Sequence, residues 1–402
     1  MAFLIFLIFF FIYTPPLFSY NILHFLSLIS YIGILFKYNI EFINYLNSIQ
    51  IRLFLLLYFF AILSLSFTIL FTTKDFIKLY SYLIVPIEVI PTAFYICCVF
   101  FDRKKWKNSI FDLIVISSLL QSFLSIIAFL NIDFKNIIIS HFYKDAFNMI
   151  PALQAEYLTA FRIFGLSTSL TFAMPVVQGL ISSLCFYYSL EKSFKYFIPI
   201  PFLLFSALIN ARTGLLIFIV NMFIILIFFL KKTRVRNYLR SFLIFICIFL
   251  ILLTSFSFLE TTNRSLYDWL INGKNEIVSL FHGEKTGTFA ILDEMWILPK
   301  QNIFIGNGYD IFLESYYNSD IGFVNILYLG GIIFSFFLYT SYILFFFYSF
   351  KTNNLFLFLS IISIFLCNIK GNAFVQSPIT NYLFLFAISI YFERKQVLFL
   401  KK

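Results

Sequence analysis

The sequence predicts an all-α, polytopic integral membrane protein with about twelve transmembrane helices and with both termini in the cytoplasm. Hydrophobic residues make up 61% of the chain and charged residues only 12%, whereas about 25% of the residues of a soluble protein are charged. The apolar runs are continuous, as in the segment 51–71, and lack the alternating polarity of a membrane β-barrel. Short basic clusters separate these runs, which is typical of loops that set membrane orientation.

Each crossing of the hydrocarbon core takes about 20 apolar residues, or fewer where a segment is kinked. Twelve such segments are predicted: 2–13, 20–36, 51–71, 79–101, 109–130, 166–190, 197–210, 214–230, 241–258, 322–348, 355–370 and 379–392. The first segment lacks a basic region before it and a small-residue cleavage site after it, so we expect a span rather than a cleaved signal. Residues 1–402 are therefore expected to form a single polytopic membrane domain with about ten to twelve spans.

The charges of the loops predict the orientation. With the N-terminus inside, six cytoplasmic segments contain 18 of the 29 Lys and Arg residues: 37–52, 102–108, 191–196, 231–240, 349–354 and the C-terminal tail. An excess of Lys and Arg marks the cytoplasmic side of a membrane protein. The external side then carries two long loops, about 131–165 and about 259–321. Loops of this length are usually functional, so function is expected on the outer face.

Several classes of function are excluded by the same composition. The net charge of +10 comes from clusters between apolar runs, and there is no basic stripe with exposed aromatics that would indicate nucleic-acid binding. The cysteines all lie inside apolar runs, and neither they nor the histidines show metal-ligand spacing. No cofactor is expected.

A break between two apolar runs places a permanent cation at the outer membrane boundary. The segment is Ser206-Ala-Leu-Ile-Asn-Ala-Arg212-Thr-Gly, in which small residues and glycine let the backbone turn. An arginine at membrane depth costs about 2.5–3.5 kcal/mol and normally has a partner or a role. The planar guanidinium of Arg212 suits bidentate capture of phosphate. The alternative is an interfacial arginine that extends to water.

The second long loop returns into a membrane helix through Ser319-Asp320-Ile-Gly322, followed by Gly330-Gly331. Ser319 or Asp320 could cap this helix, and the glycines permit close helix approach. Asp320 could equally act in chemistry, and the two roles are compatible.

Further charged residues lie near the outer face. Arg162 precedes the hydroxyl-rich segment 165–169, Arg264 lies in the second long loop, and Lys370 ends the eleventh span. Glu88 lies in the middle of a span between two prolines. A carboxylate at that depth either serves a function, as in a proton-coupled transporter, or is neutral and hydrogen-bonded within the bundle.

These segments together resemble the O-antigen polymerases (Wzy type). The resemblance rests on 210–215 (Asn-Ala-Arg-Thr-Gly-Leu), on Arg162 with the glycine and hydroxyl residues after it, on Met295-Trp296 leading to Gly306-Asn-Gly308, and on 319–322 before the Gly-Gly helix. The architecture agrees along nearly the whole chain.

The resemblance implies a glycosyltransferase of lipopolysaccharide biosynthesis in the bacterial inner membrane. It would transfer the growing glycan from undecaprenyl diphosphate to an incoming lipid-linked repeat unit on the periplasmic face. Arg212 and Asp320 would be catalytic: the cation would stabilise the leaving diphosphate, and the carboxylate would act on the acceptor hydroxyl. Arg162, Arg264 and Lys370 would bind substrate. Expected partners are the undecaprenyl-diphosphate-linked oligosaccharide, membrane lipid and a chain-length regulator protein.

Two alternatives stay open. An O-antigen ligase uses the same donor and resembles this chain in topology, but usually carries a histidine where Asp320 lies. A lipid-linked oligosaccharide flippase or other secondary transporter would favour internal repeats and charges inside the bundle. We find no repeat and one deep carboxylate, Glu88.

Overall fold

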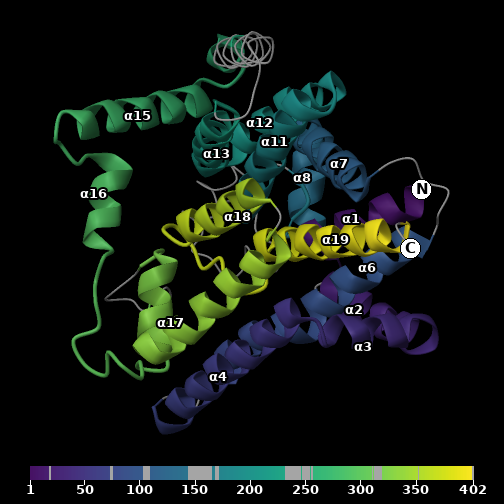
Figure 1. Ribbon diagram of the computed structural model, residues 1–402. Helices are drawn as coiled ribbons and strands as arrows, with labels where there is room; N and C mark the ends of the chain where they lie inside the picture. The colour runs from purple at the N-terminus through teal and green to yellow at the C-terminus, as the bar shows by residue number, and fades with distance from the viewer. Residues whose placement is uncertain are drawn as a thin grey trace. The chain divides into compact units, whose positions relative to one another are not determined.

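The computed structural model describes residues 1–17, 20–72, 76–102, 109–143, 165–167, 172–230, 246, 254, 257–309, 311, 319–351 and 353–400. These residues are almost entirely helical (Figure 1). The strands among them form one antiparallel hairpin, in which Pro16–Leu17 pairs with Tyr20–Asn21. The predicted all-α class is therefore confirmed.

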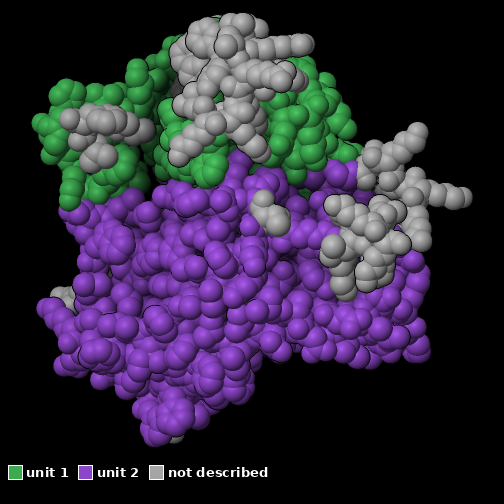
Figure 2. Space-filling view, in the orientation of Figure 1, with its two compact units in different colours: residues 1–22, 112–291 green, residues 23–111, 292–402 purple. Residues whose placement is uncertain are grey.

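The chain forms two compact units, each built from segments that are distant in the sequence (Figure 2). Unit 1 comprises residues 1–22 and 112–291, and unit 2 comprises residues 23–111 and 292–402.

Unit 1 is centred on α11, all but the last residue of which is buried. Its helices are α1 (Ala2–Tyr13), α7 (Ile110–Leu130), α8 (Ile132–Phe142), α11 (Ala173–Glu191), the 3-10 turn η3 (Phe194–Phe197), α12 (Pro199–Asn210), α13 (Arg212–Leu230), α15 (Arg264–Phe281) and most of α16 (Gly287–Glu294). Helices α11 and α13 lie so close together that a Cβ at Gly179 would lie 2.1 Å from the carbonyl oxygen of Gly214. Small residues of this kind allow the backbones of membrane helices to touch.

Unit 2 is built around two long helices, α4 and α17, which pack along each other. Its elements are α2 (Ile22–Gly33), the π-helix η1 (Ile34–Tyr38), α3 (Asn39–Leu46), α4 (Ile49–Phe71), α5 (Phe76–Ile84), the π-helix η2 (Val85–Val89), α6 (Ile90–Asp102), α17 (Gly322–Ser349), α18 (Asn354–Cys367) and α19 (Pro378–Leu400). Helix α6 packs against α19. Aromatic rings fill the space between α4, α17 and α19, among them Phe54, Tyr342 and Phe384.

Helix α17 is broken at Gly331, whose φ of 68° and ψ of −168° are not helical. The segment 303–308 supplies the missing partners of the break. Ile332 N–H donates to the carbonyl of Ile303 (2.9 Å) and Ile333 N–H to that of Phe304 (3.1 Å), while the amides of residues 307 and 308 donate to the carbonyls of residues 328 and 329. The Gly306 and Gly330-Gly331 motifs of the sequence therefore meet, and these backbone groups of the break are satisfied although the helix is interrupted.

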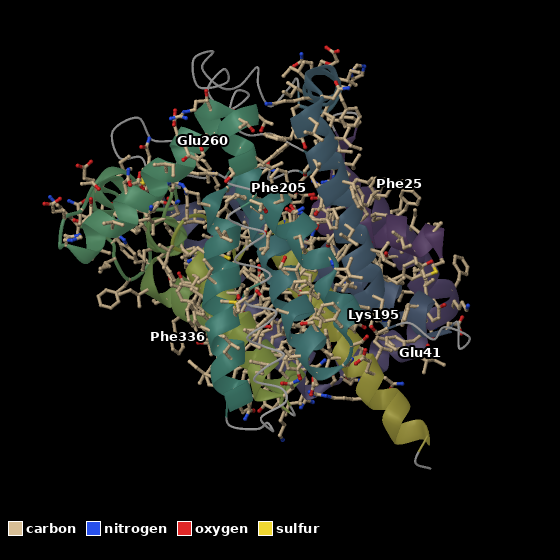
Figure 3. All side chains as sticks on the ribbon, turned by 90° about the horizontal axis from the view of Figure 1, so that it is seen from above. Phe25, Glu41, Lys195, Phe205, Glu260 and Phe336 are labelled. Atoms are coloured by element: carbon tan, nitrogen blue, oxygen red, sulfur yellow. The ribbon has the colours of Figure 1, made fainter. Side chains whose placement is uncertain are left out.

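Six of the described helices are long and apolar enough to cross a membrane: 22–46, 49–71, 76–102, 110–130, 173–191 and 322–349. Large apolar side chains on the surface of unit 2, such as Phe25 (63% exposed) and Phe336 (61% exposed), are labelled in Figure 3. A lipid-facing exterior accounts for such exposure, since soluble proteins rarely expose large contiguous apolar patches. Four further apolar helices are shorter: 2–13, 194–210, 212–228 and 354–367. The count of twelve spans stays a prediction.

The helix bounds agree closely with the predicted spans at 51–71, 109–130 and 322–348, where α4, α7 and α17 lie. The segment 241–258 lies mostly outside the described residues. The structure differs from the prediction at 37–46, which was expected to be a cytoplasmic connection but continues as helix. The two long segments predicted to be external also contain helices, namely α8 in the first and α15 and α16 in the second.

Candidate functional site

The break between α12 and α13 fixes the position of Arg212. Ala211 is extended (φ −162°, ψ 139°), so α12 ends at Asn210 and α13 begins at Arg212. The side-chain amide of Asn210 donates to the carbonyl of Ser206 at 3.0 Å, which stabilises the end of α12. Gly214, in the first turn of α13, packs directly against α11, since a Cβ at Gly214 would lie 2.2 Å from the carbonyl oxygen of Pro175. The predicted break is confirmed, and Arg212 lies at the N-terminus of a helix, where the aligned peptide dipoles favour anions.

The guanidinium of Arg212 lies on one face of α15, the first described helix of the second long loop. Its Cζ is 4.4 Å from the ring centroid of Trp269, and its Nη1 is 3.7 Å from Oε2 of Glu276. A Cβ at Gly273 would lie 1.8 Å from the same nitrogen. Positions 269, 273 and 276 share a helical face, so Arg212 occupies a slot lined by an aromatic ring, a glycine and a carboxylate.

The slot is partly open to its surroundings. The Arg212 side chain is 30% exposed and the Glu276 side chain 16%. The ion-pair distance of 3.7 Å exceeds that of a hydrogen bond, so this carboxylate does not occupy the N–H donors of the guanidinium. The start of α16 lies close to this acid, since a Cβ at Gly287 would lie 2.3 Å from Oε1 of Glu276. An arginine held in place in this way can bind a phosphate by donating two parallel N–H hydrogen bonds to its oxygens.

Arg264 does not share the partners of Arg212 on α15. It begins α15, is 65% exposed, and pairs with Glu260 (3.1 Å) and Asp268 (3.2 Å), each four residues away. Figure 3 labels Glu260 close to the start of α15. Positions 264 and 268 lie on a different face of α15 from positions 269, 273 and 276. Exposed pairs of this kind contribute at most about 1 kcal/mol.

Arg162 lies outside the described residues. The segment that follows it, 165–167, is anchored in unit 1. The amide of Ser167 donates to the Tyr143 hydroxyl at 2.8 Å, and that hydroxyl lies 2.8 Å from the carbonyl of Ser167. The amide of Leu166 donates to Oε1 of Gln121 at 3.3 Å.

Asp320 and Lys370 flank a second junction, which lies in unit 2. The amide of Phe323 donates to the carbonyl of Asn368 at 3.3 Å, and a Cβ at Gly322 would lie 2.6 Å from the carbonyl oxygen of Gly371. Asp320 lies two residues before Gly322, and Lys370 immediately precedes Gly371. The backbone therefore brings these two predicted site residues to one junction, between the start of α17 and the segment after α18.

The expected helix cap at Ser319 or Asp320 is corrected by the structure. The N-cap residue of α17 is Ile321, and no side chain caps it. The Ser319 hydroxyl accepts from the amide of Ile321 (3.2 Å) and donates to the carbonyl of Met295 (2.9 Å). Its role is to hold the long loop against the start of α17, where Trp296 stacks on Phe323 at 6.3 Å.

The sequence did not identify Trp269, Gly273 and Glu276 as site residues. Their spacing of four and then three residues, on a helix with a strong polar and apolar division, is the signal that could have found them. Nor did it identify His24 as the partner of Glu88, from which it is separated by 64 residues. Among the described residues there is no group of three or more His, Cys, Asp or Glu that could hold a metal ion.

The two predicted catalytic residues belong to different compact units, Arg212 to unit 1 and Asp320 to unit 2. Comparisons of the chain with models of protein families, with curated proteins and with solved structures found no match. The helices that are long and apolar enough to cross a membrane are consistent with a membrane protein.

Proposed function

We propose that this chain polymerises lipid-linked O-antigen repeat units at the outer face of the inner membrane. The observation that carries the proposal is the position of Arg212, at the N-terminus of α13 and on the face of α15 formed by Trp269 and Glu276. A preorganised cation of this kind stabilises charge that develops on a leaving group. In this reaction the leaving group is undecaprenyl diphosphate.

In the proposed step, the acceptor hydroxyl oxygen bonds to the anomeric carbon of the donor glycan, and the bond from that carbon to the diphosphate oxygen breaks. The diphosphate keeps the electron pair and is stabilised by Arg212. Asp320 orients the acceptor hydroxyl and takes its proton. Lys370, at the same junction as Asp320, adds positive charge for the substrate, and Arg162 and Arg264 remain proposed substrate contacts.

The experiment is complementation of a deletion strain, read as the lipopolysaccharide ladder on a gel. Arg212→Ala should leave a single-repeat band, because the donor diphosphate is no longer stabilised. Arg212→Lys should also be impaired, since lysine supplies neither a bidentate fork nor the same stacking on Trp269. Arg52→Ala, on the exposed face near the start of α4, is the matched control and should give a full ladder. A normal ladder from a well-expressed Arg212→Ala variant would remove Arg212 from the mechanism.

The same gel separates the alternatives. Deletion of a polymerase leaves single repeats attached to lipid A-core, whereas deletion of an O-antigen ligase or a lipid-linked oligosaccharide flippase leaves no O-antigen at all. The ligase alternative is less favoured because Asp320 stands where such enzymes usually carry a histidine.

A further inference from the structure

A partly exposed histidine and a largely buried glutamate of unit 2 face each other, on two helices that are long and apolar enough to cross a membrane. Nδ1 of His24, in the first turn of α2, lies 2.8 and 2.7 Å from the two carboxylate oxygens of Glu88 in η2. The Glu88 side chain is 11% exposed and the His24 side chain 43%. The other ring nitrogen of His24, Nε2, lies 3.4 Å from the hydroxyl of Tyr80.

The depth of this pair follows from a second ion pair on the same two helices. Nζ of Lys37 lies 2.5 Å from Oδ2 of Asp102, and both residues belong to segments whose charges predict a cytoplasmic position. Thirteen residues separate His24 from Lys37 and fourteen separate Glu88 from Asp102, which corresponds to about 20 Å of helix. Since the hydrocarbon core is about 30 Å thick, the predicted orientation places the His24–Glu88 pair within the membrane, in its outer half.

Glu88 lies in an irregular part of the helix backbone. Residues 85–89 form a π-helical turn between α5 and α6, and such turns are frequent at functional sites. The hydroxyl of Tyr31 donates to the carbonyl of Ile87 at 2.5 Å. Tyr31 lies seven residues after His24 on the same helix, so α2 contacts η2 at two points on one face.

From this geometry we infer that Glu88, His24 and Tyr80 form a proton-binding site within the membrane. With one proton on Nδ1, the imidazole is neutral and the dyad carries the charge of the carboxylate. A second proton, taken from hydronium or a protonated buffer, binds Nε2 on the side of Tyr80 and brings the net charge of the dyad to zero. A charged group within the bilayer is disfavoured, so the number of bound protons changes the free energy of holding this pair between α2 and η2.

Other titratable groups lie on the elements that pack against η2, among them Lys78 on α5 and Tyr95, Cys97 and Cys98 on α6. Among the described residues, Tyr31 from α2 and Tyr80 from α5 lie close enough for the charge of Glu88 to act on them. Helix α19 also packs against η2 and carries Tyr382, Glu393 and Arg394. Of these, Arg394 donates to the carbonyl of Tyr348 at 3.5 Å.

The test uses the three histidines of the chain. His141 and His282 lie at the ends of α8 and α15, and their Nδ1 atoms contact carbonyls of their own helices. The variant His141→Gln/His282→Gln leaves His24 as the single histidine. The full-length protein, labelled with 15N-histidine and reconstituted in phospholipid nanodiscs, is followed by NMR as the pH is lowered. The expected spectrum shows a neutral ring protonated at Nδ1, which gains its second proton at Nε2.

Glu88→Gln in the same background should abolish this signature, because the amide no longer fixes the Nδ1–H tautomer. Glu88→Asp should partly restore it, and Glu41→Gln, on the exposed face of α3, should leave it unchanged. An unaltered tautomer and an unaltered titration in Glu88→Gln would overturn the inference.

A second measurement keeps the inference testable if Glu88→Gln does not fold. Infrared difference spectra of the unmodified protein between neutral and acidic pH should contain a contribution from the dyad that is lost in His24→Gln. Identical difference spectra for the two proteins would contradict a shared proton site. Neither measurement depends on polymerase activity, so its outcome is independent of the proposed function.

Discussion

The guanidinium of Arg212 lies over the ring of Trp269, with 4.4 Å between its central carbon and the ring centroid. This contact joins the break between α12 and α13 to α15, a helix of the segment 259–321. The stacking of arginine on tryptophan contributes about 0.5–2 kcal/mol, depending on how far it is desolvated. Trp269 therefore helps to hold the guanidinium of Arg212 in place on α15.

Gly273→Ala tests whether this position matters. The new Cβ would lie 1.8 Å from Nη1 of Arg212, so the guanidinium must leave its slot. Alanine in a helix normally stabilises by about 1 kcal/mol relative to glycine, so a loss of function cannot be attributed to propensity. We expect polymerisation to fall about 10- to 100-fold, measured as the shift of the ladder to single repeats. Asn272→Ala, on the exposed neighbouring position, should retain the ladder.

Asp320→Asn and Asp320→Ala together separate proton transfer from a structural role. If Asp320 takes the proton of the acceptor, both variants should lose about 100-fold or more of the rate of transfer, measured with purified lipid-linked repeat units. Since Ile321 is the N-cap residue of α17, the Asn variant should keep the melting temperature of the parent. Full activity of Asp320→Asn would show that the carboxylate is not the base. Ser319→Ala is the stability comparison, and it should lower the melting temperature by removing the bond to Met295.

Gly331→Ala, at the buried break of α17, should destabilise the protein more than Gly283→Ala at an exposed turn. Its φ is positive, and a Cβ would lie 2.4 Å from the carbonyl oxygen of Phe304. Backbone strain of this kind costs about 1–3 kcal/mol before any clash is counted. Gly283 also has a positive φ but nothing within 4 Å of its Cβ position, so Gly283→Ala isolates the backbone contribution. Thermal unfolding in detergent should show a clearly larger loss for Gly331→Ala, and equal losses would contradict the close packing at the break.

Lys135 predicts a pH dependence of stability. It lies on α8 with 4% exposure, and burial lowers its pKa from 10.5 to about 8. The unfolded chain therefore binds more protons than the folded chain between about pH 8 and 10.5, so the free energy of unfolding should rise with pH across that window. Below it, the burial penalty is constant and amounts to a few kcal/mol at most, at about 1.4 kcal/mol per pKa unit.

Lys135→Met removes the charge and keeps the length of the side chain. It should raise the melting temperature at pH 7 and abolish the increase in stability above pH 8. Chemical denaturation of parent and variant at several pH values measures both effects. A parent whose stability stays flat or falls between pH 8 and 10 would contradict the effect of burial on this pKa.

The sequence predicted the apolar helices well because lipid imposes one simple requirement, a run of apolar residues of sufficient length. The bounds of α4, α7 and α17 agree with the prediction within two residues. The break at Ala211 was also predictable, since a small residue, a charge and a glycine interrupt the apolar run there.

The arrangement of the candidate site was not predictable in the same way. Helix α15 is polar on one face, so hydropathy alone placed it in a loop, and its contact with Arg212 joins residues about sixty positions apart. The pairing of His24 with Glu88 depends on α2 running alongside α5 and α6, which no local pattern encodes. The Gly330-Gly331 motif was expected to allow close helix approach. In the structure, α17 is broken at Gly331, and the segment 303–308 supplies hydrogen-bond partners to the backbone groups at the break.

The break in α17 has a consequence for the order of membrane insertion. The amides and carbonyls around Gly331 find their partners in 303–308, and the hydroxyl of Thr68 on α4 donates to the carbonyl of Ile305. Backbone groups without partners are not tolerated in lipid. The ribosome makes α4 and then 303–308 before it makes Gly331, so both partners already exist when the broken helix leaves the translocon. Transposing the long external segment to a later point in the gene would deprive α17 of its partners at the moment it meets lipid.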